Sequence, residues 1–508
     1  HGVLDAAKTD ELSEGLPTIY QKLREAGVWT ATAGKDDLTL LGALRGQPCR
    51  RSAGGGEKCG DRRTRQLGFE DSARCYGKEF VRIARAPLDP YMEELEKRGW
   101  LKQLRQEAMT LCVDVEGIEG RGYVCPNVTR IPQDEFIDDW IARRAAELVR
   151  RAPTDKPLFL QVNYAGPHTP MIITRGMRAS LARNFSWPLA RNSRSLDPSI
   201  QQLMRSAYAA GIQNIDSLNH AILEAVWARG RWNNSLVCIL SDHGEMLADL
   251  WDLSPDYEPL GKSCPWQAAI SVPLACMGPG VPPGRTVDDP VSVLDLAGTV
   301  LDLQGAPAPP GMDAVSLRGL LQGGAPDGRP AVSTLLIPNH RFSTAQKRFG
   351  DGRIYKLICC IGACPLGRLL RSAAERGGGP PQEGWVRKLF DLSSDPGETH
   401  DVLAGHPEVA AELAAALEPP LRGCGLDEAG SSMTSSQKAN RSSATPAAGG
   451  AAEFTDAEPS DVSVLTAEHW ALSDAGEAPA ASADLPLWRA SLLAHGAPSY
   501  APLCLAAA

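Results

Sequence analysis

The segment 241–245, with the sequence SDHGE, directly follows the apolar run 236–240. Its neighbouring carboxylate and imidazole, Asp242 and His243, are donors that a divalent cation can use, or they can hold the counter-ion of an anionic substrate. Alternatively, the aspartate caps a turn beside a surface histidine. These residues alone do not separate the two interpretations.

A second segment of this kind is 166–170, with the sequence GPHTP, which follows the apolar run 157–164. Its prolines restrict the backbone and hold His168 in one orientation. A single loop histidine is most often only exposed to solvent. Two histidine-bearing loops that each follow a predicted strand are better explained by a shared site.

Two lysines also follow predicted elements. Lys35 comes shortly after the β-prone run 28–32, and Lys262 lies in the sequence GKS at 261–263. A phosphate-binding loop would need glycine where Asp256 stands, so the nucleotide-binding interpretation fails on spacing. Each lysine is either a surface residue or a contact for a tetrahedral anion. Two histidines, a carboxylate and two lysines together suit metal-assisted hydrolysis of a charged ester.

Alternating helices and strands along residues 1–322 would position these side chains. Apolar residues at helical spacing predict helices over 134–151, 198–228 and 291–303, and apolar runs predict strands over 157–164, 236–240 and 272–277. This order predicts an α/β fold with a mostly parallel central sheet flanked by helices. Ligands of such sheets bind beyond the carboxyl ends of the strands.

The remainder of the chain divides into two parts. Residues 323–424 contain apolar runs and a helical pattern over 407–418, which predict a smaller α+β subdomain. Residues 425–508 are rich in alanine, serine and glycine and hold ten acidic but only three basic residues, which predicts a disordered acidic tail. Residues 49–66, rich in glycine, arginine and cysteine, predict an irregular loop.

The composition of the 508-residue chain is that of an ordinary globular protein, with 43% hydrophobic and 22% charged residues. The formal net charge is −9, and most of the excess lies in the acidic tail. The body therefore lacks the electrostatic footprint of nucleic-acid binding, and we expect no nucleic-acid partner. No apolar stretch reaches the roughly 18 residues of a membrane-spanning helix, so we expect no membrane span.

The series of segments resembles the type I sulfatases of the alkaline phosphatase superfamily over residues 1–420. The histidine loop FLQVNYAGPHTP at 159–170, the metal motif SDHGE and the lysines of Gly34-Lys35 and Gly261-Lys262 occur in the family's order. The segment DLSSDPGET at 391–399 is similar to the family's C-terminal signature. The resemblance implies an alkaline phosphatase-like fold and hydrolysis of a sulfuric ester.

The resemblance also implies a mechanism, in which formylglycine made from Cys or Ser attacks the sulfur while a divalent cation, usually Ca²⁺, holds the sulfate. Lysines stabilise the anion, and a histidine protonates the leaving alcohol. By position, Lys35, His168 and Lys262 would be the catalytic contacts, and Asp242 and His243 the metal ligands. An imidazole in the ligand set leaves the identity of the metal open, because calcium prefers oxygen ligands.

The sequence departs from the family at the nucleophile. The motif of Cys or Ser followed by x-Pro-Ser-Arg is absent, and Cys125 and Cys364 begin only near matches at other places in the order. We therefore expect the formylglycine residue to lie upstream of His1, in an N-terminal part of the catalytic domain that this sequence lacks. We expect the chain as printed not to turn over substrate. Asp37 also stands where many relatives place a catalytic histidine.

The resemblance leaves three functions open: a sulfatase acting on a small-molecule or carbohydrate sulfate ester, a phosphoesterase or phosphonate hydrolase of the same superfamily, or a non-catalytic sulfatase-like binding protein. Relatives are usually secreted, lysosomal or periplasmic, so the resemblance favours a secretory or extracytoplasmic location. Four sequons for N-glycosylation are compatible with that location, at Asn127, Asn184, Asn233 and Asn440.

Overall fold

The computed structural model describes residues 17–36, 59–84, 86–114, 122–180, 188–253, 260–337, 340–361 and 385–417. Its first sheet is parallel, in the order β2-β1-β3, and consists of β1 (Trp29–Lys35), β2 (Asp71–Cys75) and β3 (Leu158–Asn163). The central strand β1 is buried along almost its whole length, as expected for a parallel strand covered on both faces.

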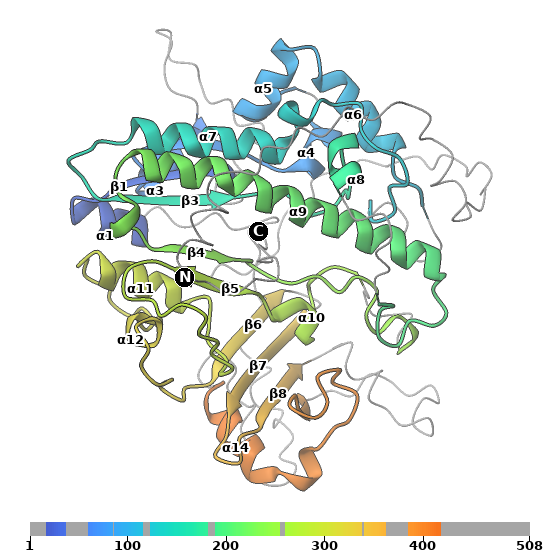
Figure 1. Cartoon of the computed structure of the whole chain (residues 1–508). Coiled ribbons are helices and arrows are strands. Elements are labelled where there is room, and N and C mark those ends of the chain that lie inside the picture. The colour runs from blue at the N-terminus through green and yellow to red at the C-terminus, as the bar shows by residue number, and fades with distance from the viewer. Residues whose placement is uncertain are drawn as a thin grey trace, which may run out of the picture.

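Helices cover both faces of this sheet (Figure 1). The amphipathic helix α7 (Ile137–Arg151) packs on one face, where alternate β3 residues such as Leu158 and Leu160 meet it. Helix α1 (Ile19–Glu25) packs on the other face, where Phe159 joins its cluster. Thr18 begins α1 with a capping box, because its hydroxyl accepts from the amide of Gln21.

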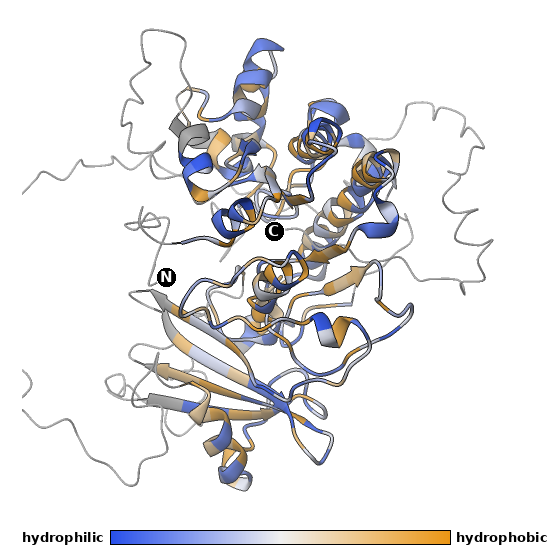
Figure 2. Ribbon diagram, turned by 90° about the vertical axis from the view of Figure 1, so that its left-hand side faces the viewer, coloured by the Kyte–Doolittle hydropathy of each residue, from blue (hydrophilic) through white to orange (hydrophobic). Residues whose placement is uncertain are grey.

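The 31-residue helix α9 (Pro198–Ala228) lies along α7 (Figure 1). The other helices of the N-terminal part are α3 (Cys59–Leu67), α4 (Lys78–Ile83), α5 (Pro90–Lys97), α6 (Leu101–Thr110), α8 (Arg175–Ser180), α10 (Gln267–Ile270), α11 (Asp295–Leu303) and α12 (Arg318–Leu321). Short 3₁₀ turns are η1 (Gln133–Glu135), η2 (Trp232–Asn234), η3 (Trp251–Leu253) and, near the C-terminus, η4 (Leu403–Gly405). Several helices have one hydrophobic and one hydrophilic side (Figure 2).

Strands β4 (Val237–Leu240) and β5 (Leu274–Met277) form a separate two-stranded sheet. They run antiparallel, and Cys238 and Cys276 are opposite each other and form a disulfide. The alternation of strands and helices did not predict this direction. Among the described residues between the two strands, only the short η3 and α10 occur, and neither is the long helix that usually connects parallel neighbours.

The C-terminal part contains an antiparallel sheet in the order β6-β7-β8-β9, followed by one helix. Its elements are β6 (Ala331–Ile337), β7 (His340–Arg348), β8 (Ile354–Ile361), β9 (Trp385–Asp391) and α14 (Pro407–Ala415). The α/β fold with a smaller α+β part is thus confirmed. The boundaries at 322 and 424 stay predictions, and the predicted tail lies outside the described residues.

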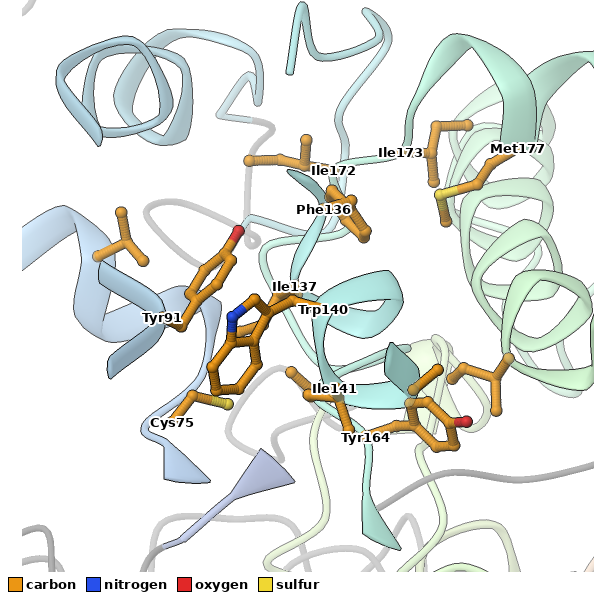
Figure 3. Close-up of a cluster of buried hydrophobic side chains, with 14 of the residues drawn as sticks. Cys75, Tyr91, Phe136, Ile137, Trp140, Ile141, Tyr164, Ile172, Ile173 and Met177 are labelled. Carbon is orange, nitrogen blue, oxygen red and sulfur yellow. The ribbon is translucent and has the colours of Figure 1, made fainter. Parts of the chain in front are cut away.

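The largest core cluster joins the parallel sheet to the helices of the N-terminal part. Figure 3 shows Trp140 of α7 beside Tyr91 and Cys75, and the rings of Tyr91 and Trp140 are 5.6 Å apart. The expected loop over 49–66 is wrong in its second part, where α3 begins at Cys59. Arginine is a good helix former, which the loop interpretation neglected. No described helix is long and apolar enough to cross a membrane.

Candidate active site

The predicted site residues stand at the ends of three strands. Lys35 is the last residue of β1, and His168 follows the end of β3 by five residues. Because β1 and β3 are parallel neighbours, with Gly34 opposite Asn163, their carboxyl ends meet at the same edge of the sheet. Asp242 comes shortly after the end of β4 (Val237–Leu240).

Glu79 connects the first two of these groups. Its carboxylate lies 3.3 Å from the Nζ atom of Lys35 through Oε1 and 3.8 Å from Nδ1 of His168 through Oε2. Sequence reasoning missed Glu79, which lies in α4 just after β2. The rule that ligands follow strands would have found it, but the sequence DSARC of β2 lacks the apolar run by which a buried strand is recognised.

The loop of His168 is held by the helix beneath it. The Oδ1 atom of the buried Asp138, on α7, accepts hydrogen bonds from the amides of Ala165 at 2.8 Å and Gly166 at 2.9 Å. Nδ1 of His168 lies 2.7 Å from the carbonyl oxygen of Thr169. Since a carbonyl only accepts, Nδ1 carries the proton of the neutral ring and Nε2 carries the lone pair.

Burial, followed by the positive charge of Lys35, lowers the pKa of His168 to about 3. Lys262 and the buried Lys78 act in the same direction, while the hydrogen bond to the carbonyl of Thr169 opposes them. The imidazole of His168 is therefore neutral at neutral pH when no anion is bound.

His243 and Lys262 form a second group. The Nζ atom of Lys262 lies 2.5 Å from Nε2 of His243, and Oδ2 of Asp242 lies 3.4 Å from the same nitrogen. Nδ1 of His243 lies 2.7 Å from the carbonyl oxygen of Gly244, so the Nε2 lone pair accepts from the lysine. Burial lowers the pKa of His243, against the opposing charge of Asp242.

The two groups belong to one site. The charges of Lys35 and Lys262 both lower the pKa of His168, and both also lower that of His243. The two lysines therefore add positive charge to the surroundings of both rings. The structure thus connects Lys35 with His168 through Glu79 and brings Asp242, His243 and Lys262 into contact with one another, and the two groups share an electrostatic environment. The roles of the five residues stay predictions.

A calcium ion does not fit the described residues alone. Calcium takes about six to eight oxygen ligands, and among the residues that the structure describes no group of three or more His, Cys, Asp or Glu side chains is placed to hold a metal. The Nε2 atom of His243 already accepts a hydrogen bond from Lys262. Asp242 and His243 would need further ligands from elsewhere, so the predicted cation stays a prediction.

The remaining sequence predictions concern Cys125, Cys364 and Asp37. Cys125, the first near match to the nucleophile motif, forms a disulfide with Cys112 and so has no thiol. Cys364 and Asp37 lie outside the described residues.

Comparisons with known proteins come from sequence and from structure. The sulfatase family model matches residues 2–306. Arylsulfatase K of Danio rerio is 29% identical over 215 residues, which are 41% of this chain and 36% of that protein. An arylsulfatase of Clostridium perfringens is 23% identical over 206 residues, which are 36% of this chain and 41% of that protein. The chain thus matches well under half the length of these curated relatives.

Solved structures share the fold at low sequence identity. A phosphonate monoester hydrolase from Silicibacter pomeroyi has a TM-score of 0.54 at 20% identity, over 82% of this chain and 81% of that one. A protein in complex with its substrate D-glucosamine-2-N,6-O-disulfate has a TM-score of 0.53 at 14% identity, over 83% and 85% of the two chains. Because the family model covers more than half of the residues, this chain belongs to the sulfatase family.

Proposed function

We propose that the whole protein hydrolyses a sulfuric ester at the site formed by Lys35, His168 and Lys262. The observation that carries the proposal is the group of Lys35, Glu79 and the neutral His168 at the carboxyl edge of the parallel sheet, where the charge of Lys262 also acts on His168. The two ammonium groups, which contact Glu79 and Nε2 of His243, supply the positive charge that a tetrahedral anion requires.

In the proposed reaction, the ammonium groups of Lys35 and Lys262 stabilise the sulfate oxygens. His168 presents Nε2 to the site because Nδ1 donates to Thr169. A neutral ring cannot protonate the leaving alcohol, so His168 must first gain a proton. The negative charge of a bound ester offsets that of the lysines and favours the imidazolium form.

The nucleophile and the cation are not assigned to described residues. Formylglycine would supply the attacking oxygen, and Ca²⁺ remains the cation that the resemblance implies. Asp242 and His243 are the side chains that would contribute to its coordination.

We propose a small-molecule or carbohydrate sulfate ester as substrate. The structural neighbour that holds a disulfated glucosamine supports this class, through a shared fold only. We also propose an extracytoplasmic location. The disulfides Cys112–Cys125 and Cys238–Cys276 support it, since disulfides persist mainly in oxidising compartments.

Matched assays of the protein expressed from its complete natural gene, with an aryl sulfate and an aryl phosphate, test the proposal. We expect sulfate hydrolysis that Lys262→Ala abolishes. Faster hydrolysis of the phosphate ester would support the alternative, a phosphoesterase or phosphonate hydrolase, with which the fold of the phosphonate monoester hydrolase is compatible. Sulfate binding without turnover of either ester would identify a non-catalytic binding protein.

A further inference from the structure

The segment that carries Lys262 packs against the C-terminal sheet. Cys264, Trp266 and Ala269 lie in one buried apolar cluster with residues of β7, β8 and β9, and the rings of Trp266 and Phe390 are 6.1 Å apart. Figure 1 shows α10 at the end of this sheet, beside β6 and β7. The C-terminal part therefore touches the site through the segment 260–270.

A buried ion pair reinforces this contact. The Nζ atom of Lys356, on β8, lies 2.5 Å from Oε1 of Glu398, and the two side chains are 0% and 3% exposed. Lys356 also donates to the carbonyl oxygen of Pro265 at 2.6 Å. The other carboxylate oxygen of Glu398 accepts from the amide of Gln267 at 2.7 Å. The ion pair thus makes hydrogen bonds to the backbone on both sides of Trp266, to the carbonyl of Pro265 and to the amide of Gln267.

The same segment is fixed to the loop of His243 on its other side. The amide of Gly244 donates to the carbonyl oxygen of Ala269 at 2.7 Å, and Oε1 of Glu245 accepts from the amide of Gly261 at 2.5 Å. The amide of Met246 donates to the carbonyl oxygen of Gly261 at 3.1 Å. The Lys262 segment is therefore held between the C-terminal sheet and the loop at 242–246.

Secondary structure does not explain the position of Lys262. Residues 260–266 contain bends but no helix or strand, so their backbone position depends on these outside contacts. Glu398 belongs to the segment 391–399, which the proposed reaction has not otherwise used.

We propose that the ion pair Lys356–Glu398 positions the Lys262 segment, so that the C-terminal sheet sets the anion affinity of the site. Lys356 and Glu398 are positioning residues, because they act through the backbone of residues 265–267. This inference rests on the proposed function for its anion-binding consequence. The mechanical consequence, the ordering of residues 261–270, does not depend on that function.

The test compares two variants of the protein expressed from its complete natural gene. Lys356→Met combined with Glu398→Leu removes both side-chain hydrogen bonds to the backbone of residues 265–267. The double variant leaves no buried charge unpaired. Leu413→Ala, in the buried contact of α14 with the sheet, lowers stability without touching residues 265–267. Calorimetry measures the binding of inorganic sulfate, and hydrogen exchange with mass spectrometry measures the protection of residues 261–270.

We expect the double variant to bind sulfate roughly tenfold more weakly and to exchange residues 261–270 faster than the parent. We expect Leu413→Ala to lower the unfolding temperature while sulfate affinity and exchange in this segment stay unchanged. The proposal is overturned if the double variant exchanges residues 261–270 like the parent, or if Leu413→Ala loses as much protection there.

A different result would reject the proposed function but not the proposal that Lys356 and Glu398 position the Lys262 segment. If Lys262→Ala binds sulfate as tightly as the parent, or the parent binds none, the anion site is wrong. Faster exchange of residues 261–270 in the double variant, but not in Leu413→Ala, would still support the positioning role of Lys356 and Glu398.

Discussion

Replacing Asp138 with alanine would remove the acceptor that fixes the His168 loop to α7. Its Oδ1 atom accepts the amides of both Ala165 and Gly166, at 2.8 and 2.9 Å. Asp138 is 1% exposed, so water cannot easily take its place in the folded protein. The carboxylate also opposes the fall in the pKa of Lys78, whose burial disfavours its charged form.

The size of the effect follows from these contacts. Each buried amide left without a partner costs about 1–3 kcal/mol. Asp138→Ala leaves the two amides of Ala165 and Gly166 without this partner, so we expect it to lower the free energy of unfolding by about 2–6 kcal/mol. Asp138→Asn keeps an acceptor oxygen, and we expect a loss of about 1–3 kcal/mol.

Urea denaturation of the two variants measures these losses. The control is Asp134→Ala, on the exposed side of η1, for which we expect a change within about 0.5 kcal/mol. Asp138→Ala should also weaken sulfate binding, because it releases the loop of His168. A variant with the stability of the parent would refute the view that Asp138 holds this loop.

Three further predictions concern the site. With a folded-state pKa of about 3, against about 6.5 in the unfolded chain, the His168 ring should stay neutral through neutral pH in an NMR titration. The unfolded chain binds that proton more readily, so His168 contributes stability that is fully present above about pH 6.5 and falls toward pH 3; a free-protein pKa above 6 would contradict this. Gly244→Ala would place its Cβ 2.1 Å from the carbonyl oxygen of Ala268, so both the unfolding temperature and sulfate affinity should fall. The printed 508 residues should bind sulfate in calorimetry yet show no turnover of an aryl sulfate, because they contain no Cys or Ser followed by x-Pro-Ser-Arg, and measurable turnover would refute the need for that motif.

Elements with a strong and regular pattern could be predicted from the sequence. The apolar stripe of α7 and the long helix α9 appear close to their predicted bounds, and so does β3. The edge strand β2 could not be recognised, because DSARC contains few apolar residues and its pairing with β1 depends on the fold. The direction of β5 likewise depends on its partner β4 and not on its own sequence.

The candidate site shows the same division. Lys35, His168, Asp242 and His243 could be found because each follows a strand with a readable pattern. Glu79 and Asp138 could not be found in this way. Glu79 follows the unrecognised β2, and Asp138 has the sequence context of an ordinary acidic residue in the first turn of an amphipathic helix. Only the tertiary structure places the carboxylate of Asp138 under the amides of residues 165 and 166.

The electrostatics of His168 link substrate binding to proton transfer in the proposed reaction. The same lysines that suit the site for an anion, Lys35 and Lys262, lower the pKa of His168. Nε2 of the His168 ring therefore carries no proton to donate until a bound anion offsets the charges of the two lysines. A bound ester would supply the leaving group and would also raise the pKa of His168, the group that protonates it. An uncharged ester of similar shape would bind without that change. Sulfate should therefore raise the pKa of His168, whereas a neutral sulfone of similar size should not.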